Sequence, residues 1–116
     1  MSADPIHDTL VLRILEYART HLAEPDLTPA RLAAEHNISI RQLYTVLGRA
    51  DISLGDWIRT HRLERCRQEL ASPAARTRTI ASIARRWAFK DATHFSRAFR
   101  DAYGMTPRQW RAIDHS

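Results

Sequence analysis

Cysteine, glycine and lysine are scarce in this chain of 116 residues. The single cysteine, Cys66, excludes an internal disulfide and fits a reducing compartment. Three glycines do not supply the glycine-rich loop with which nucleotide-binding enzymes hold phosphates. No pair of carboxylates lies in an apolar setting that would suit acid–base catalysis. These absences predict a protein that is not an enzyme.

The sequence also lacks a long apolar run and a metal-binding motif. No apolar stretch approaches the ~18 residues that span a bilayer, and the first ten residues have neither the basic start nor the apolar centre of a secretory signal. The six histidines are scattered, and no HExxH or paired-cysteine motif occurs. Cys66 has helical spacing from Leu63 and Leu70, which favours a core position. We therefore expect a cytoplasmic protein with no membrane association, no metal and no cofactor.

Positive charge is concentrated in the second half of the chain. Residues 1–58 carry five arginines against eight acidic residues, a balance of −3, whereas residues 59–116 carry twelve arginines and Lys90 against five acidic residues, a balance of +8. The forked guanidinium of arginine suits phosphates and base edges. A basic half of this kind is typical of nucleic-acid binding. The alternative is a helical protein-interaction module whose basic face binds an acidic partner.

The segment TIASIA, at residues 79–84, nearly repeats the segment TPARLA, at residues 28–33. The match continues with apolar residues in the same order, which pair as Leu32 with Ile83, Ile38 with Phe89, Leu43 with Phe95, Leu47 with Phe99 and Trp57 with Trp110. An ordered series of this kind indicates a duplicated structural unit. A protein-interaction module would explain the charge but not this recurrence.

Each copy predicts a short helix, a tight turn and a second helix. Thr28 is a good N-cap and Pro29 a good first helical residue, and Thr79 opens the equivalent helix. Ser39 and Asp91 can cap the second helices. The expected elements are two helix-turn-helix motifs, over residues 28–50 and 79–103, whose second helices cover residues 40–49 and 92–103.

The two second helices are amphipathic. Apolar residues recur at helical spacing and should face the core, leaving polar and cationic side chains that can contact base edges and phosphates. The inward set is Leu43, Val46 and Leu47 in the first copy and Phe95, Ala98 and Phe99 in the second.

A long helix should connect the two copies over residues 54–71. Eighteen residues make a helix about 27 Å long, and recognition helices about 34 Å apart enter successive major grooves. The connecting helix therefore suits a rigid spacer. We also expect a first helix over about residues 8–23, and a last short helix that begins at Pro107. The core face of the first helix is predicted to comprise Leu12, Leu15, Ala18 and Leu22.

The segment FKDATHFSRAFRDAYGMTPRQWR, at residues 89–111, resembles the DNA-binding domain of the AraC/XylS family of bacterial transcription regulators. The resemblance covers the chain from about Leu10 to Arg111. It implies an all-α, seven-helix, bilobed domain over residues 8–116, with two helix-turn-helix motifs joined by the long central helix. It also implies sequence-specific binding of double-stranded promoter DNA by two recognition helices in successive major grooves, and contact with RNA polymerase, most often for activation. The protein would be associated with the nucleoid when bound.

The family pattern and residue chemistry together suggest two sets of DNA-contacting residues. The expected base-reading residues are Arg41, Tyr44, Thr45, Thr93, Ser96 and Arg97. The expected phosphate-binding residues are Thr28, Gln42, Arg49, Thr79, Lys90, Arg100 and Arg108. Arg97 could instead contact a phosphate. Arg62 and Arg111 match family arginines for which packing and salt bridging are favoured over DNA contact.

Three positions depart from the family pattern. Ala88 stands where glycine is usual, and it would be strained if that position needs a positive φ. Asp51 replaces a glycine at the end of the first recognition helix, where aspartate tolerates the left-handed conformation better than most residues. Leu47 replaces a common phenylalanine. We therefore expect the fold to be kept, with a less regular first half.

Most members of the family carry an effector-binding or dimerising domain before this one. Residues 7–29 resemble the junction in such longer members, which favours a fragment of a longer regulator over a stand-alone protein. A fragment should be monomeric, with tandem DNA half-sites. The effector, the operator sequence, the target genes and the sign of regulation are not encoded in a recognisable motif.

Overall fold

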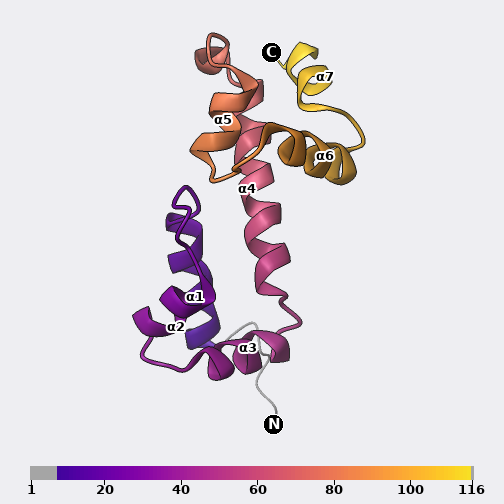
Figure 1. Cartoon of the computed structure of the whole chain (residues 1–116). Helices are drawn as coiled ribbons and strands as arrows, with labels where there is room; N and C mark the ends of the chain where they lie inside the picture. The colour runs from indigo at the N-terminus through magenta and orange to yellow at the C-terminus, as the bar shows by residue number, and fades with distance from the viewer. Residues whose placement is uncertain (1–7, 116) are drawn as a thin grey trace. The chain divides into compact units, whose positions relative to one another are not determined.

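The computed structural model describes residues 8–115, and all regular structure within them is helical. The predicted all-α class is therefore confirmed, and the structure has the expected long helix between two groups of shorter ones (Figure 1). The elements are α1 (Thr9–Thr20), α2 (Pro29–Glu35), α3 (Ile40–Arg49), α4 (Leu54–Ala71), the 3₁₀ helix η2 (Pro73–Ala75), α5 (Ile80–Arg86), α6 (Ala92–Tyr103) and α7 (Pro107–Ala112).

The chain divides into two compact units, Met1–Arg59 and Thr60–Ser116. The first unit contains α1 to α3 and the start of α4. The second contains the rest of α4 and the helices that follow it (Figure 1). Because α4 continues through Arg59 and Thr60 without interruption, a single helix contributes to the core of both units.

Side-chain caps begin the helices of the first unit. The Thr28 hydroxyl accepts a hydrogen bond from the Arg31 amide at 3.2 Å, and Pro29 follows at the first helical position. Ser39 and Gln42 form a reciprocal capping box at the start of α3: the Gln42 amide donates to Ser39 Oγ, and Gln42 Oε1 accepts from the Ser39 amide. The starts of α2 and α3 are thus encoded locally.

The expected core face of the first helix is confirmed at Ala18 and Leu22 but differs at Leu12 and Leu15. Val11, Ile14 and Ala18 are buried, whereas Leu12 is 50% exposed and Leu15 is only partly buried. Residues 10–15 read LVLRIL, so two apolar stripes of similar quality lie side by side on this helix. Packing of α1 against α2 selects the stripe with Val11 and Ile14, which the spacing of apolar residues could not decide.

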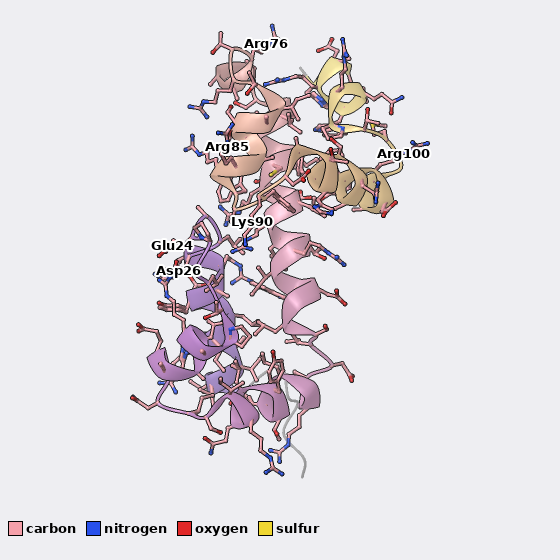
Figure 2. The ribbon with its side chains drawn as sticks, in the orientation of Figure 1. Glu24, Asp26, Arg76, Arg85, Lys90 and Arg100 are labelled. Atoms are coloured by element: carbon pink, nitrogen blue, oxygen red, sulfur yellow. The ribbon has the colours of Figure 1, made fainter. Side chains whose placement is uncertain are left out.

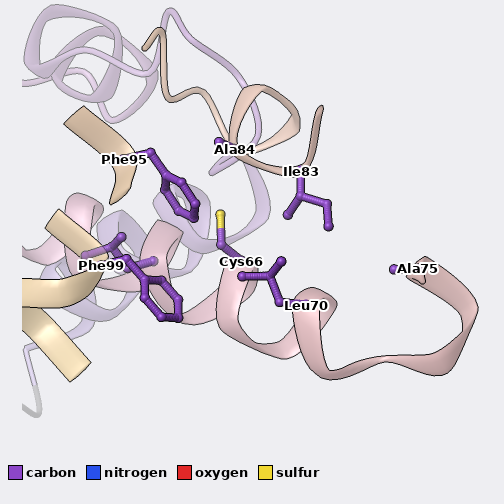
Figure 3. Packing of buried hydrophobic residues seen from close by; sticks show 8 residues of the cluster. Cys66, Leu70, Ala75, Ile83, Ala84, Phe95 and Phe99 are labelled. Atoms are coloured by element: carbon purple, nitrogen blue, oxygen red, sulfur yellow. The ribbon is translucent and has the colours of Figure 1, made fainter. Parts of the chain in front are cut away.

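The core of the second unit is aromatic and is centred on α4. Phe95 and Phe99 of α6 point toward Cys66 and Leu70 of α4, and Ile83 of α5 closes the cluster (Figure 3). The two phenylalanine rings lie 5.8 Å apart between centroids, which is a favourable separation for a tilted aromatic pair. This packing fixes one face of α6 and leaves the opposite face to solvent.

A polar network on α4 ties α6 and α7 to the same core. Arg67 makes two hydrogen bonds to the Glu64 carboxylate, at 2.6 and 2.9 Å, and Tyr103 donates a third at 3.0 Å. The Arg67 guanidinium also lies 5.3 Å from the Tyr103 ring centroid and 5.1 Å from that of Trp110. The Arg67 hydrogen bonds hold the pKa of Glu64 below its ordinary value, and burial together with the bond to Glu64 raises the pKa of Tyr103 to about 12.

Three residues other than glycine adopt a positive φ among the described residues, and each ends a helix. Asn37 after α2 and Ala88 after α5 occupy equivalent positions, with φ values of 55° and 69°. The next amide in each copy, that of Ile38 or Phe89, donates to a carbonyl five residues earlier at 3.0 Å, which makes a Schellman motif. Asp51, at 56°, ends α3 in the left-handed conformation, as expected.

Replacing Ala88 with glycine should stabilise the fold. A Cβ in the left-handed region is strained, so Ala88→Gly should raise the free energy of unfolding by about 1 kcal/mol. Ala34→Gly is the matched control, because Ala34 lies inside α2 and glycine there should lower the stability by up to about 1 kcal/mol. Chemical denaturation of both variants measures the two changes. A decrease for Ala88→Gly would contradict the strain at this position.

The Cys66 thiol should be unreactive in the folded protein. It is fully buried, as the helical spacing predicted, and burial raises its pKa to about 12. A disulfide reagent at pH 8 should therefore label almost no protein in buffer and one thiol per chain in denaturant, because the thiolate is the nucleophile. Rapid labelling without denaturant would show that this core opens.

Candidate nucleic-acid interface

The three base-reading candidates of the first unit lie on the solvent side of α3. Leu43 and Leu47 are completely buried on the other side and anchor the helix. Arg41, Tyr44 and Thr45 are exposed, and Tyr44 exposes 52% of its surface. The Thr45 hydroxyl donates to the Arg41 carbonyl at 3.0 Å, so its oxygen is still able to accept a hydrogen bond.

Four of the predicted residues line one surface hollow in the first unit. The hollow lies along α3 beside the start of α1, and its walls combine apolar and cationic side chains. Its lining comprises Leu10, Ile38, Arg41, Gln42, Thr45, Val46 and Arg49. The structure thus brings Arg41, Gln42, Thr45 and Arg49 together, while Tyr44 lies outside the hollow. Val46, expected to face inward, is half-buried at its edge.

In the second unit, α6 likewise has a buried apolar side and an exposed polar side. Asp91 caps the helix by accepting hydrogen bonds from the amides of Thr93 and His94, at 2.7 and 3.2 Å, and these bonds lower the pKa of its carboxyl group. Thr93 and Arg97 are exposed, whereas Ser96 is half-buried. Ser96 is therefore the least accessible of the six base-reading candidates.

Two phosphate candidates, Thr28 and Thr79, are helix N-caps. Each hydroxyl oxygen accepts an amide hydrogen bond, from Arg31 or Ser82, which leaves the hydroxyl hydrogen free to donate to a phosphate. The side-chain oxygen of Gln42 accepts a hydrogen bond in the capping box, and its side-chain nitrogen is the group that can donate to a phosphate. The cationic candidates Arg49, Lys90, Arg100 and Arg108 are all exposed.

Acidic residues neutralise part of the positive charge of the second unit. Glu69 of α4, whose side chain is 12% exposed, lies 3.3 Å from Arg78 and 3.6 Å from Arg86, and accepts a hydrogen bond from Trp87. Within residues 8–115, Arg97 and Arg100 form no ion pair with an acidic side chain. These two guanidinium groups are therefore not held by an acidic side chain, although α6 also carries the exposed Asp101.

Cationic side chains of the second unit lie on several of its elements. Figure 2 shows Arg76 near η2, Arg85 on α5 and Arg100 on α6, each directed away from the core. Net charge alone therefore does not identify the binding face. The exposed faces of α3 and α6 are distinguished by their position after a helix-turn-helix turn.

Sequence reasoning missed the role of Arg31 in α2. Its guanidinium donates to the Tyr17 hydroxyl, to Glu24 and to Asp26 at 2.9–3.0 Å, and the bonds to Tyr17 and Glu24 raise its pKa. Both acidic residues lie in the α1–α2 connection (Figure 2). Arg31 therefore holds that connection against α2. The pair of acids shortly before an arginine was the only signal for this in the sequence.

Arg62 and Arg111 are both only partly exposed. Arg111 donates to the Ala75 carbonyl at 2.8 Å and so joins α7 to the η2 turn. Burial lowers the pKa of Arg62. These environments suit the packing role expected for both residues, although the bond of Arg111 is to a carbonyl and not to a carboxylate.

The described residues contain neither a cluster of metal-binding side chains nor a helix long and apolar enough to cross a membrane. A family model described as a helix-turn-helix domain matches residues 32–113, which is more than half of the chain. The chain belongs to the AraC family. The family and the fold are those of DNA-binding transcription regulators, which are not enzymes.

A curated relative of this AraC-type domain is the transcriptional activator NphR of Rhodococcus sp.. The two are 28% identical over 111 residues, which is 95% of this chain and 32% of the relative. The chain thus spans about a third of the length of the curated relative it matches.

Two solved structures of regulators are similar to this chain. The C-terminal domain of AraT, a response regulator from Geobacillus stearothermophilus, has a TM-score of 0.79 at 26% identity and 94% coverage of both chains. A transcriptional regulator with an AraC-type DNA-binding domain from Chromobacterium violaceum has a TM-score of 0.81 at 24% identity, over 92% of this chain and 93% of that one. The second likeness supports the fold alone.

The second unit should contribute more non-specific DNA affinity than the first. We predict that reversing Arg97 and Arg100 to glutamate weakens binding to random duplex more than reversing Arg41 and Arg49, because residues 59–116 carry the positive balance. For each phosphate that a variant no longer neutralises, the slope of log K against log salt should fall in magnitude by about 0.9. Fluorescence anisotropy across a salt series measures both. A larger loss from the Arg41 and Arg49 pair would contradict the prediction.

Proposed function

We propose that this domain binds promoter DNA sequence-specifically, with α3 and α6 inserted into successive major grooves. The observation that carries the proposal is the repeated geometry of the two units. In each, a Schellman motif precedes a side-chain-capped helix whose buried face is apolar and whose exposed face is polar and cationic. Base edges are read by Arg41, Tyr44, Thr45, Thr93, Ser96 and Arg97, and phosphates are bound by Thr28, Gln42, Arg49, Thr79, Lys90, Arg100 and Arg108.

The continuous helix α4 suits one polypeptide that reads two groove segments. It spans residues 54–71 and contributes packing residues to both units. Residues 28–50 and 79–103 are then the two DNA-reading modules, within a domain that extends over residues 8–116. The isolated chain is expected to bind as a monomer, to two boxes in tandem.

The proposed regulatory effect is activation of transcription through contact with RNA polymerase in the bacterial cytoplasm. The support is the name of the relative NphR, which is a transcriptional activator. Transcription in vitro from a promoter that carries the selected site tests this part. Increased product with the full chain supports activation, and decreased product indicates repression.

A different reading of the basic surface is binding of an acidic protein partner. Uncompensated Arg97 and Arg100 on α6 would serve either ligand. Such binding would not require two equivalent capped helices, so the duplication favours DNA.

Selection of binding sites from random duplex DNA is the decisive experiment. We expect enrichment of two short boxes about one helical turn apart, and an affinity for the winner that falls steeply with salt, with a log–log slope of about −0.9 per neutralised phosphate. Alanine replacement of Arg41 should relax the preference in one box, and replacement of Arg97 in the other. Ala34→Gly, which lies outside both reading faces, is the control for loss of fold.

Each alternative outcome has a distinct meaning. One enriched box would show that one unit only positions the protein. Binding without enrichment would leave a non-specific DNA-binding domain. The absence of binding at low salt would discard this proposal in favour of the acidic protein partner.

A further inference from the structure

Two large hydrophobic side chains on α3, those of Ile40 and Tyr44, are exposed and do not belong to the buried core. The described residues contain four mostly apolar large side chains with substantial exposure, and two of these, Ile40 at 45% and Tyr44 at 52%, lie on this one helix. Leu43 and Leu47 already anchor α3 with no exposed surface. Single exposed apolar residues are ordinary on protein surfaces. Two such residues on the helix that is proposed to enter the major groove instead suggest that they contact a ligand.

Ile40 and Tyr44 form one patch, because residues four apart lie on the same side of a helix. A long helical side chain leans toward the helix N-terminus, so the Tyr44 ring lies toward Ile40. One turn further along the same side, Gly48 has open space where a Cβ would be. Ile40 is also the first residue of α3, and the N-terminal residues of a recognition helix are those that meet base edges.

The duplicated unit supplies an internal comparison. The register that pairs Leu43 with Phe95 pairs Ile40 with Ala92 and Tyr44 with Ser96. The same side of α6 is therefore small and polar where α3 is large and apolar. The two helices share a fold but should differ in the base chemistry that they accept.

We propose that Ile40, together with the Tyr44 ring, contacts the C5-methyl group of a thymine in the box read by the first unit. The thymine methyl is the one apolar group that base edges present in the major groove. Arg41 and Thr45 on the neighbouring side of α3 would bind polar base edges at the same time. This inference rests on the proposed insertion of α3 into the major groove, and it makes Ile40 a specificity-determining residue.

The test removes single methyl groups from the DNA. Each thymine of the selected site is replaced in turn by deoxyuridine, which lacks only the C5-methyl, and the affinity of the full chain is measured by anisotropy. We expect one thymine at which the wild-type protein loses about fourfold in affinity, the value of one buried methyl group. Ile40→Ala should bind the thymine and deoxyuridine duplexes about equally at that position.

Control variants separate methyl contact from other effects. Leu12→Ala removes a similarly exposed leucine on α1 and should keep the wild-type response to deoxyuridine. Ile40→Val, a smaller change, should reduce it in part, and thermal unfolding confirms that each variant is folded.

Different results would overturn the methyl contact and the proposed function. Specific binding with identical deoxyuridine effects in the wild type and Ile40→Ala, or selected boxes with no enriched thymine, would overturn the methyl contact and leave the proposed function in place. The absence of any enriched sequence would overturn the proposed function itself.

Discussion

The direction of α3 and of α6 depends in each case on one residue in the left-handed conformation. Asn37 in the first unit and Ala88 in the second end a helix with positive φ, and the following amide bonds back to Ala33 or Ala84 at 3.0 Å. This reversal brings the chain to a capping residue from which the next helix begins. Because the same motif occurs twice, the exposed faces of α3 and α6 arise from one local rule.

Within the second unit, two carboxylates of α4 complement the aromatic core. Glu64 accepts hydrogen bonds from Arg67 and Tyr103, and Glu69 accepts one from Trp87. Breaking such part-buried hydrogen bonds to charged groups leaves unsatisfied polar atoms, so the network favours a single packing of α5, α6 and α7 on α4. In the first unit Arg31 has the analogous role, with the acids outside the long helix. The exposed Arg97 and Arg100 take part in neither network.

Much of the helix order was predictable because helix starts are determined by interactions between neighbouring residues. Thr28, Ser39, Thr79 and Asp91 cap the helices that the sequence assigned to them. The core face of the first helix was predicted correctly at Ala18 and Leu22 but wrongly at Leu12 and Leu15, since residues 10–15 offer two stripes and tertiary packing makes the choice. The hollow beside α3 was also unpredictable, because Leu10 joins it from a helix thirty residues earlier. Ile40 was counted only as a helix start, and its exposure depends on what packs beside it.

The sequence by itself determined the all-α class, the duplication and the places where helices begin, because caps, turn residues and apolar spacing act over a few residues. It also determined the family, through the spacing of residues 89–111. Tertiary structure decided which arginines are held by acids and which remain uncompensated, and which apolar side chains stay in solvent. Several of those outcomes depend on residues far apart in the chain, such as Arg78 with Glu69, Arg31 with Tyr17 or Tyr103 with Glu64, and their proximity is created only when the helices pack.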